Sequence, residues 1–220
     1  MLRLFLLAAL PLLAQSISLK PAAWSILYSP GVPQHPSALP GGGWAFSFPA
    51  VPDLTCAATS SCPSVNYVIT KYTTPITAHY LTMTLRVETT GGAIFNGILQ
   101  PDNNCVGGDP PRVRFLIWKA RLGGGAYDRW WADDASTGWY TLADGTITLT
   151  VALVADGMWS SVFGETNNSS AAATAGWQAV LATPGAVGMT FGGNCFLAHG
   201  TDISPATATA KFSVLAMSFF

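Results

Sequence analysis

The chain has 220 residues with a formal net charge of −1, and only 10% of its residues are charged. No basic stripe is present that could neutralise a phosphate backbone, which argues against nucleic acid as a partner. Half of the residues are hydrophobic, and 22 glycines and 15 prolines accompany them. This composition is typical of an all-β domain with many turns rather than of a disordered chain.

Residues 1–16 have the pattern of a secretory signal peptide. Arg3 precedes an apolar run from Leu4 to Ala14, and Ala14 and Ser16 provide the small-x-small end that a signal peptidase needs. The alternative is a buried strand or short helix, since about ten apolar residues cannot span a bilayer. No later apolar run is long enough for a membrane span. We therefore expect a secreted or periplasmic protein without a membrane anchor.

Four cysteines suit an oxidising compartment. Cys56 and Cys62 would close a short loop, and Cys105 and Cys195 would then pair across a long one. Three pairings are possible, and the sequence does not choose among them. Free thiols or a zinc site are the alternative, but zinc-binding cysteines usually form pairs with two to four residues between them. Disulfides are the better interpretation.

Residues 17–43 are predicted to form a proline-rich arm. Seven prolines lie between residues 17 and 52, a density that disfavours both a helix and a central strand. Trp44, Phe46 and Phe48 then alternate, so that all three rings share one face of an extended chain. We expect the arm to enter a single β-sandwich domain, residues 44–220, at Trp44.

Alternating apolar and polar residues predict strands along most of this domain. In residues 79–88 the apolar set Leu81, Met83, Leu85 and Val87 faces inward. Residues 115–118 are apolar on both faces, as in a strand that is covered on both sides. Further strands are predicted over residues 65–70, 93–95, 146–153, 187–191 and 212–220.

One segment, residues 169–182, is rich in alanine and predicts a helix. Serines at its start are candidate caps, Pro184-Gly185 ends it, and Trp177, Val180 and Leu181 should pack inward. About ten strands with regular turns and one short helix predict an all-β, jelly-roll-like β-sandwich. We expect this sandwich to be disulfide-bonded.

Tryptophans and acids concentrate in residues 127–139. On a strand, Arg129 and Trp131 would share one face and Trp130 the other, so both tryptophans cannot enter the same core. Indole rings beside hydrogen-bonding groups can stack on sugars. The alternative is core packing, with Arg129 stacked on a tryptophan and paired to Asp128. The candidate ligand-binding residues are Tyr127, Asp128, Arg129, Trp130, Trp131, Asp133, Asp134 and Trp139.

A polar rim is the second candidate surface. A Cys105–Cys195 bridge would bring Asn103, Asn104 and Asn194 together at the ends of strands. Elsewhere, Asp128, Asp133 and Asp134 could bind a structural calcium ion, but their spacing is not the usual calcium-loop pattern, and a solvated turn is the better interpretation. We therefore expect no cofactor beyond such a calcium ion.

Signals for catalysis are weak. Glycoside hydrolysis needs two acids about 5–10 Å apart, and no pair stands out among the 11 acidic residues. Gly-x-Ser-x-Gly is absent. His199 follows Cys195 closely, but a disulfide would leave that cysteine without a thiolate. The sequence therefore predicts no catalytic residue.

Four segments together carry a resemblance to a known type of protein. They are YDRWWAD, LADGTITLTVAL, MWSSVFGE and the C-terminal GMTFGGNCFLAHGTDI with ATAKFSVLAMSF. As a set they resemble an uncharacterised family of secreted bacterial proteins, whose C-terminal halves are similar to laminin-B-like and carbohydrate-binding jelly rolls. Over roughly residues 44–220 the resemblance implies a sandwich fold, secretion and glycan binding.

These features favour a secreted, non-catalytic β-sandwich that binds a glycan or another cell-surface ligand. A structural or assembly subunit of an envelope, filament or virion is the second hypothesis, because low charge and apolar outward positions suit self-association. A polysaccharide-acting enzyme is the third.

Overall fold

The computed structural model describes residues 14–52, 62–97, 110–119, 125–133, 139–193 and 200–220. Within these ranges the chain forms fifteen strands, one α-helix and one short 3-10 helix, η1 (Pro21–Ala23). The strands build two antiparallel sheets. The predicted all-β sandwich with one short helix is confirmed.

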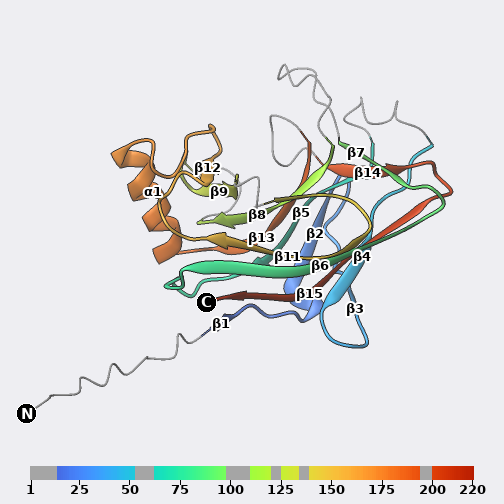
Figure 1. Ribbon diagram of the computed structural model, residues 1–220, viewed down its shortest axis with the longest axis horizontal. Coiled ribbons are helices and arrows are strands. Elements are labelled where there is room, and N and C mark those ends of the chain that lie inside the picture. The colour runs from blue at the N-terminus through green and yellow to red at the C-terminus, as the bar shows by residue number, and fades with distance from the viewer. Residues whose placement is uncertain (1–13, 53–61, 98–109, 120–124, 134–138, 194–199) are drawn as a thin grey trace, which may run out of the picture.

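The first sheet, called sheet A here, is built around the two longest strands of the described chain, β6 (Tyr80–Thr90) and β15 (Thr209–Phe219), which pair with each other (Figure 1). Strand β1 (Gln15–Ser16) pairs with the C-terminal end of β15. The order across the sheet is β11 (Gly145–Ala152), β6 (Tyr80–Thr90), β15 (Thr209–Phe219), β4 (Trp44–Ser47) and β3 (Ser37–Ala38).

The second sheet, called sheet B, has β13 (Ala186–Gly192) near its centre, paired with β8 (Arg112–Trp118) on one side and β5 (Ser64–Lys71) on the other. Two short strands join at its sides: β10 (Trp139–Thr141) pairs with β8, and β2 (Trp24–Ser29) pairs with β5. The order is β12 (Trp159–Ser161), β9 (Arg129–Ala132), β8 (Arg112–Trp118), β13 (Ala186–Gly192), β5 (Ser64–Lys71), β14 (Thr201–Ser204) and β7 (Ile94–Gly97).

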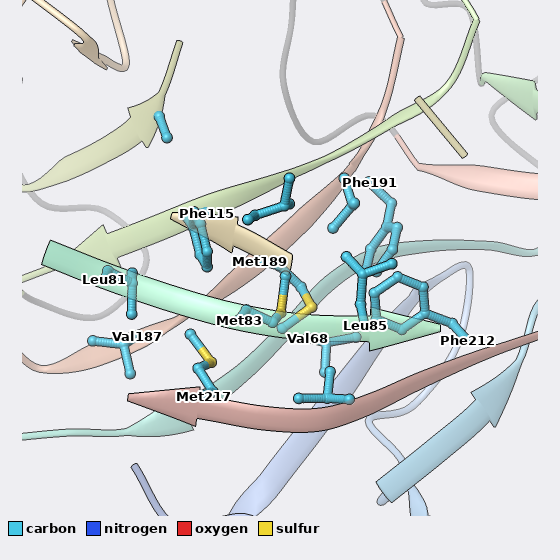
Figure 2. Close-up of a cluster of buried hydrophobic side chains, with 14 of the residues drawn as sticks. Val68, Leu81, Met83, Leu85, Phe115, Val187, Met189, Phe191, Phe212 and Met217 are labelled. Carbon is cyan, nitrogen blue, oxygen red and sulfur yellow. The ribbon is translucent and has the colours of Figure 1, made fainter. Parts of the chain in front are cut away.

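The hydrophobic core lies between the sheets. Side chains of β6 and β15 point toward those of β5, β8 and β13, as Figure 2 shows. Alternation along each strand places every second residue in this core and the others outside it. The core side chains in this view include Val68, Leu81, Met83, Leu85, Phe115, Val187, Met189, Phe191, Phe212 and Met217.

The predicted helix is present as α1 (Ala171–Ala182) at one end of the sandwich, beside β9 and β12 (Figure 1). The hydroxyl oxygen of Ser170 caps it by accepting a hydrogen bond from the Ala173 N–H (3.0 Å). Trp177 and Val180 are buried, and Leu181 packs against the core, as predicted. Trp177 contacts the rings of Trp130 and Trp159, which docks the helix onto sheet B.

Gly176 in the middle of α1 is expected to resist substitution. Alanine usually stabilises a helix relative to glycine by about 1 kcal/mol, but a Cβ at Gly176 would collide with the Cβ of Tyr127 and lie 2.8 Å from its Cγ. Gly176→Ala should therefore lower the free energy of unfolding by about 1–3 kcal/mol, a typical cost of overpacking. Urea denaturation measures the change.

The neighbouring position provides the control for this helix variant. Ala175 is exposed on α1, so Ala175→Gly should cost only the helix propensity of about 1 kcal/mol. Gly176→Ala and Ala175→Gly are thus both expected to destabilise the protein, although they are opposite substitutions at adjacent positions. A Gly176→Ala variant that is more stable than the parent protein would contradict the close packing of α1 on Tyr127.

The N-terminal segment joins the sheets earlier than predicted. Trp24 and Ile26 are buried in β2, and the Trp24 ring lies 4.8 Å from that of Trp44. The prediction that the extended, wrapping arm of residues 17–43 enters the fold at Trp44 is corrected in one respect, because the chain already joins sheet B at β2. Prolines flank β2 at Pro21 and Pro30 but do not interrupt it, so β2 keeps its backbone donors.

The helix of the described chain is not long and apolar enough to cross a membrane. Cys62 is buried and is not a free thiol. Cys56, Cys105 and Cys195 lie outside the described residues, so the disulfide pairing stays a prediction. Residues 1–13 of the expected signal peptide also lie outside them.

Candidate functional site

The face of sheet B that points away from sheet A gathers arginines and tryptophans. Strand β8 sends Val113, Phe115 and Ile117 into the core. Alternation then places Arg112, Arg114, Leu116 and Trp118 on the outer face. We call this surface the arginine–tryptophan face and define it by Tyr67, Arg112, Arg114, Trp118, Arg129, Trp131, Asp133, Trp139 and Thr190.

Strand pairing brings residues from distant parts of the chain onto this face. Arg114 lies between Thr190 of β13 and Trp139 of β10. Trp118 lies opposite Arg129 of β9, and Thr190 lies opposite Tyr67 of β5. Residues of β5, β9, β10 and β13 thus join those of β8 on one continuous face.

Each indole of residues 131–139 has an arginine close to its ring. The guanidinium carbon of Arg112 lies 3.9 Å from the ring centroid of Trp139, and that of Arg114 lies 6.0 Å from the same centroid. The guanidinium carbon of Arg129 lies 5.9 Å from the ring centroid of Trp131. Cation–π attraction holds each guanidinium against apolar surface and limits the conformations that the arginine can adopt.

An ion pair crosses this face. Arg114 Nη1 donates to Asp133 Oδ1 at 2.8 Å, and the side chains are 10% and 32% exposed. The Asp133 N–H donates to the carbonyl of Met158, which fixes its backbone. Because the arginine is largely desolvated, this ion pair is stronger than a salt bridge at the surface, and it fixes the orientation of both side chains.

Tyr67 joins the face from β5. Its ring lies 5.8 Å from that of Trp118 between centroids. Burial raises the pKa of the Tyr67 hydroxyl, while the charge of Arg129 and a hydrogen bond from it act in the opposite direction. A phenol hydroxyl, a guanidinium and two indoles therefore meet on this part of sheet B.

Several buried polar atoms of the face have no hydrogen-bond partner within the described part of the chain. They are Trp131 Nε1, Thr190 Oγ1 and Arg129 Nε. Thr190 and Trp131 are 0% and 5% exposed. Buried polar atoms normally have a hydrogen-bond partner, so these three atoms are exceptions on this face.

The structure separates the candidate residues that the sequence put together. Arg129, Trp131, Asp133 and Trp139 lie on the arginine–tryptophan face, whereas Trp130 is 0% exposed and belongs to the core. The prediction that Trp130 contacts a ligand is therefore wrong.

Tyr127 and Asp128 also serve the fold. The Tyr127 ring stacks on Trp130 with centroids 6.0 Å apart, and its hydroxyl bonds Glu165, which raises its pKa. The Gly125 N–H donates to Asp128 Oδ2 (2.6 Å), and the Asp128 carbonyl accepts from the Lys119 N–H (2.7 Å). These contacts hold the turn that leads into β9, and a ligand-binding role for both residues stays a prediction.

The expected row of exposed indoles is only partly present. Trp131 is buried in a small cluster with Leu116, Trp118 and Ala186 on the outer face of sheet B. Trp139 is partly buried beneath Arg112. Trp139 is thus the indole of residues 130–139 with ring surface left for a ligand, and Arg112 lies over one face of its ring.

Other candidates lie outside the described residues. These are Asp134 and the predicted polar rim of Asn103, Asn104 and Asn194, so the structure does not test them. Within the described residues, no group of three or more histidines, cysteines, aspartates or glutamates is placed to hold a metal ion. Of the three proposed calcium ligands, Asp128 and Asp133 face different partners, Gly125 and Arg114.

Sequence reasoning missed Tyr67, Arg112, Arg114, Trp118 and Thr190. The available signal was the Arg-Val-Arg alternation of residues 112–114, which places two arginines on the same side of a strand. This alternation points to a site only once the pairing of β10 with β8 places Trp139 beside the two arginines.

Comparison of the chain with protein-family models finds no match, and comparison with curated proteins finds no similar sequence. Functional inference therefore depends on the residues themselves. The resemblance to laminin-B-like and carbohydrate-binding jelly rolls stays a prediction.

Proposed function

We propose that this protein is a secreted, non-catalytic β-sandwich that binds a carbohydrate or another surface ligand through the arginine–tryptophan face. The observation that supports this most is the close placement of indole rings and guanidinium groups on one face of sheet B, with Trp139 only partly buried. Apolar rings with a few placed polar groups are what sugar-binding surfaces require.

The polar groups match the needs of sugar hydroxyls. Arginine offers five N–H donors in a planar fork, which can bond sugar hydroxyl groups. Trp139 supplies a ring on which the C–H face of a sugar can pack, while Arg112 holds one side of that ring. The Arg114–Asp133 pair adds a fixed carboxylate that can accept from a hydroxyl.

Replacing Trp139 tests this function. We expect Trp139→Ala to weaken glycan binding about tenfold, equivalent to about 1.4 kcal/mol, because stacking area and the support of Arg112 are lost together. Affinity electrophoresis against a panel of polysaccharides measures the effect, preceded by a glycan array that identifies the bound sugars.

Tyr80→Ala is the matched control for Trp139→Ala. Tyr80 is an exposed aromatic residue of sheet A whose ring stacks on Phe220 at 5.3 Å. It should leave binding unchanged. Equal losses in the two variants, or a parent protein that binds no glycan, would refute the proposal. Release of reducing sugar from a bound polysaccharide would instead favour the polysaccharide-acting enzyme.

An assembly subunit is the second candidate function. The observation that favours it is a set of exposed apolar side chains at turns and edges, namely Val32, Ile94 and Phe163. Size-exclusion chromatography at high protein concentration distinguishes the two, since a subunit of a filament or envelope should self-associate and a glycan-binding monomer should not.

A further inference from the structure

We infer that β11 is an edge through which this protein pairs with a second copy of itself, in an antiparallel contact centred on Thr148. The inference goes beyond the proposed function and does not depend on it. Its basis is the direction of the backbone hydrogen bonds of β11 (Gly145–Ala152), together with the length and composition of this strand at one end of sheet A.

One side of β11 is already paired. The N–H of Leu153 donates to the carbonyl of His79 at 2.8 Å, one position beyond the ladder that joins β11 to β6. In an antiparallel ladder the backbone bonds recur at every second residue, so Ile147, Leu149 and Val151 bond to β6. The residues between them therefore turn their N–H and carbonyl groups to the other side of the strand.

The other side of β11 is open over Thr146, Thr148 and Thr150. Within the described ranges, no group bonds to the backbone N–H or carbonyl of these three residues on that side. Thr146 and Thr148 are exposed. The opening ends at Ala152, whose carbonyl accepts from Trp159 Nε1 at 2.8 Å. Sheet A thus presents a short row of unpaired backbone donors and acceptors to solvent.

This edge lacks the features that usually keep sheet edges from pairing. Natural edge strands are commonly very short, or they carry charged residues, proline or a bulge. β11 has eight residues, none of them charged and none of them proline, and it pairs with β6 in continuous register. The other ends of the two described sheets are shorter, since β3 has two residues, β12 three and β7 four. β11 is therefore the sheet end best suited to accept another strand.

A second β11 fits this edge because the strand is self-complementary. With a two-fold axis through Thr148 and perpendicular to the sheet, Thr148 bonds its own copy and Thr146 bonds Thr150 of the second copy. Ile147, which is only partly buried against the core, then lies beside Leu149 of the second copy. Because β11 carries no charge, no like charges meet across the axis.

Threonine pairs on the outer face of sheet A already have the form that this contact would repeat. Thr84 Oγ1 bonds Thr148 Oγ1 at 2.8 Å, and Thr82 Oγ1 bonds Thr150 Oγ1 at 3.0 Å, in both cases between β6 and β11. Such cross-strand threonine pairs stabilise a sheet. The two-fold contact places threonine beside threonine once more, so sheet A continues from one copy into the other.

Sedimentation equilibrium of the full chain over a range of protein concentrations tests the pairing. We expect a monomer–dimer equilibrium with a Kd on the order of 100 µM, since one pair of strands is a small interface. No species larger than the dimer should form, because the contact uses the β11 of both copies. This closed dimer differs from the assembly subunit considered above, whose mass should keep growing with concentration.

Two lysine variants localise the contact. Thr148→Lys brings like charges together at the two-fold axis and should weaken the dimer at least about tenfold. Thr209→Lys is the matched control, because it adds the same charge to sheet A and removes a similar hydroxyl pair, Thr90 with Thr209 (2.6 Å), away from β11. The control should change the Kd less than about twofold. Circular dichroism verifies that both variants fold.

Cysteine variants test the register, and they decide the question if Thr148→Lys does not fold. Thr148→Cys brings two thiols together across the axis, with Cα atoms about 5.5 Å apart, which is within the range of a disulfide. Mild oxidation should therefore link two copies of this variant. The thiol of Thr146→Cys lies on the same exposed edge, but it faces Thr150 of the second copy and should stay unlinked.

Each outcome supports or overturns the inference. A parent protein that stays a monomer would overturn it and would leave this edge to an extended segment of another protein. Growth beyond the dimer would also overturn it, as would a dimer that Thr148→Lys leaves intact. Linkage through Thr146→Cys and not through Thr148→Cys would exclude the contact centred on Thr148. None of these results decides glycan binding, which is tested separately through Trp139 on sheet B.

Discussion

Replacing Trp130 by alanine is expected to lower the free energy of unfolding by about 3–5 kcal/mol, the usual cost of deleting a large buried aromatic side chain. Trp130 is fully buried, stacks on Tyr127, and meets Trp177 edge to face with ring centroids 5.6 Å apart. Its Nε1 also donates to the Tyr127 carbonyl at 2.8 Å. The substitution therefore removes one of the two aromatic contacts between sheet B and helix α1, and the contact of Trp159 with Trp177 remains.

Urea denaturation followed by far-UV circular dichroism measures this loss. Trp130→Phe keeps an aromatic ring and should lose less than half as much stability, since most of the packing remains and only the indole N–H and part of the volume disappear. Trp139→Ala is the comparison from the arginine–tryptophan face, and it should unfold near the parent protein. If Trp130→Ala kept full stability and lost only ligand binding, Trp130 would belong to a site and not to the core.

The strand pattern predicted most of the fold because each sheet has one face on a common core. Leu81, Met83, Leu85 and Val87 alternate strictly in the sequence, and all four are buried in β6. The helix was equally clear, since Ser170 caps it and Pro184-Gly185 follows it. In these segments the local preference and the tertiary environment agree.

The N-terminal segment shows where counting prolines misleads. Trp24 and Ile26 already have the spacing of a strand, and both are buried in β2. The prolines flank this strand, and β2 pairs with β5 in the described sheet. Position decides the effect of proline, because a proline at the end of a strand removes no ladder hydrogen bond.

The candidate site was harder to predict for a physical reason. Alternation correctly put Trp130 and Trp131 on opposite faces, but it cannot tell which face meets solvent. Trp131 lies on the outer face of sheet B and is still buried, in a cluster with Leu116 and Trp118. The arginines that stack on the indoles come from β8 and β9, and strand pairing alone brings β8 to Trp139.

Asp202 is expected to make the protein less stable as the pH rises from about 4 to about 6. The residue is fully buried in β14, and Asn96 Nδ2 of β7 donates to its Oδ1 at 2.7 Å. Its Oδ2 has no partner within the described residues. Burial raises the pKa of the Asp202 carboxyl from 3.8 to about 6, and the hydrogen bond from Asn96 opposes the rise.

The direction of the effect follows from proton binding. Between the two pKa values the folded protein holds a proton on Asp202 that the unfolded chain has released, so raising the pH favours unfolding. The stability that the protonated Asp202 carboxyl contributes is fully present below about pH 4 and is lost by about pH 6. A difference of about two pKa units corresponds to about 3 kcal/mol.

Two substitutions next to each other on β14 and β7 test this assignment in opposite directions. Asp202→Asn cannot ionise, so the difference in unfolding free energy between it and the parent protein should shift in its favour by about 3 kcal/mol from pH 4 to pH 7. Asn96→Ala removes the hydrogen bond that lowers the pKa of Asp202, so the pH-dependent loss should extend to higher pH. Urea denaturation at pH 4, 5, 6 and 7 measures both, and a parent protein and Asp202→Asn variant with parallel pH profiles would show that this carboxyl ionises freely in the folded state.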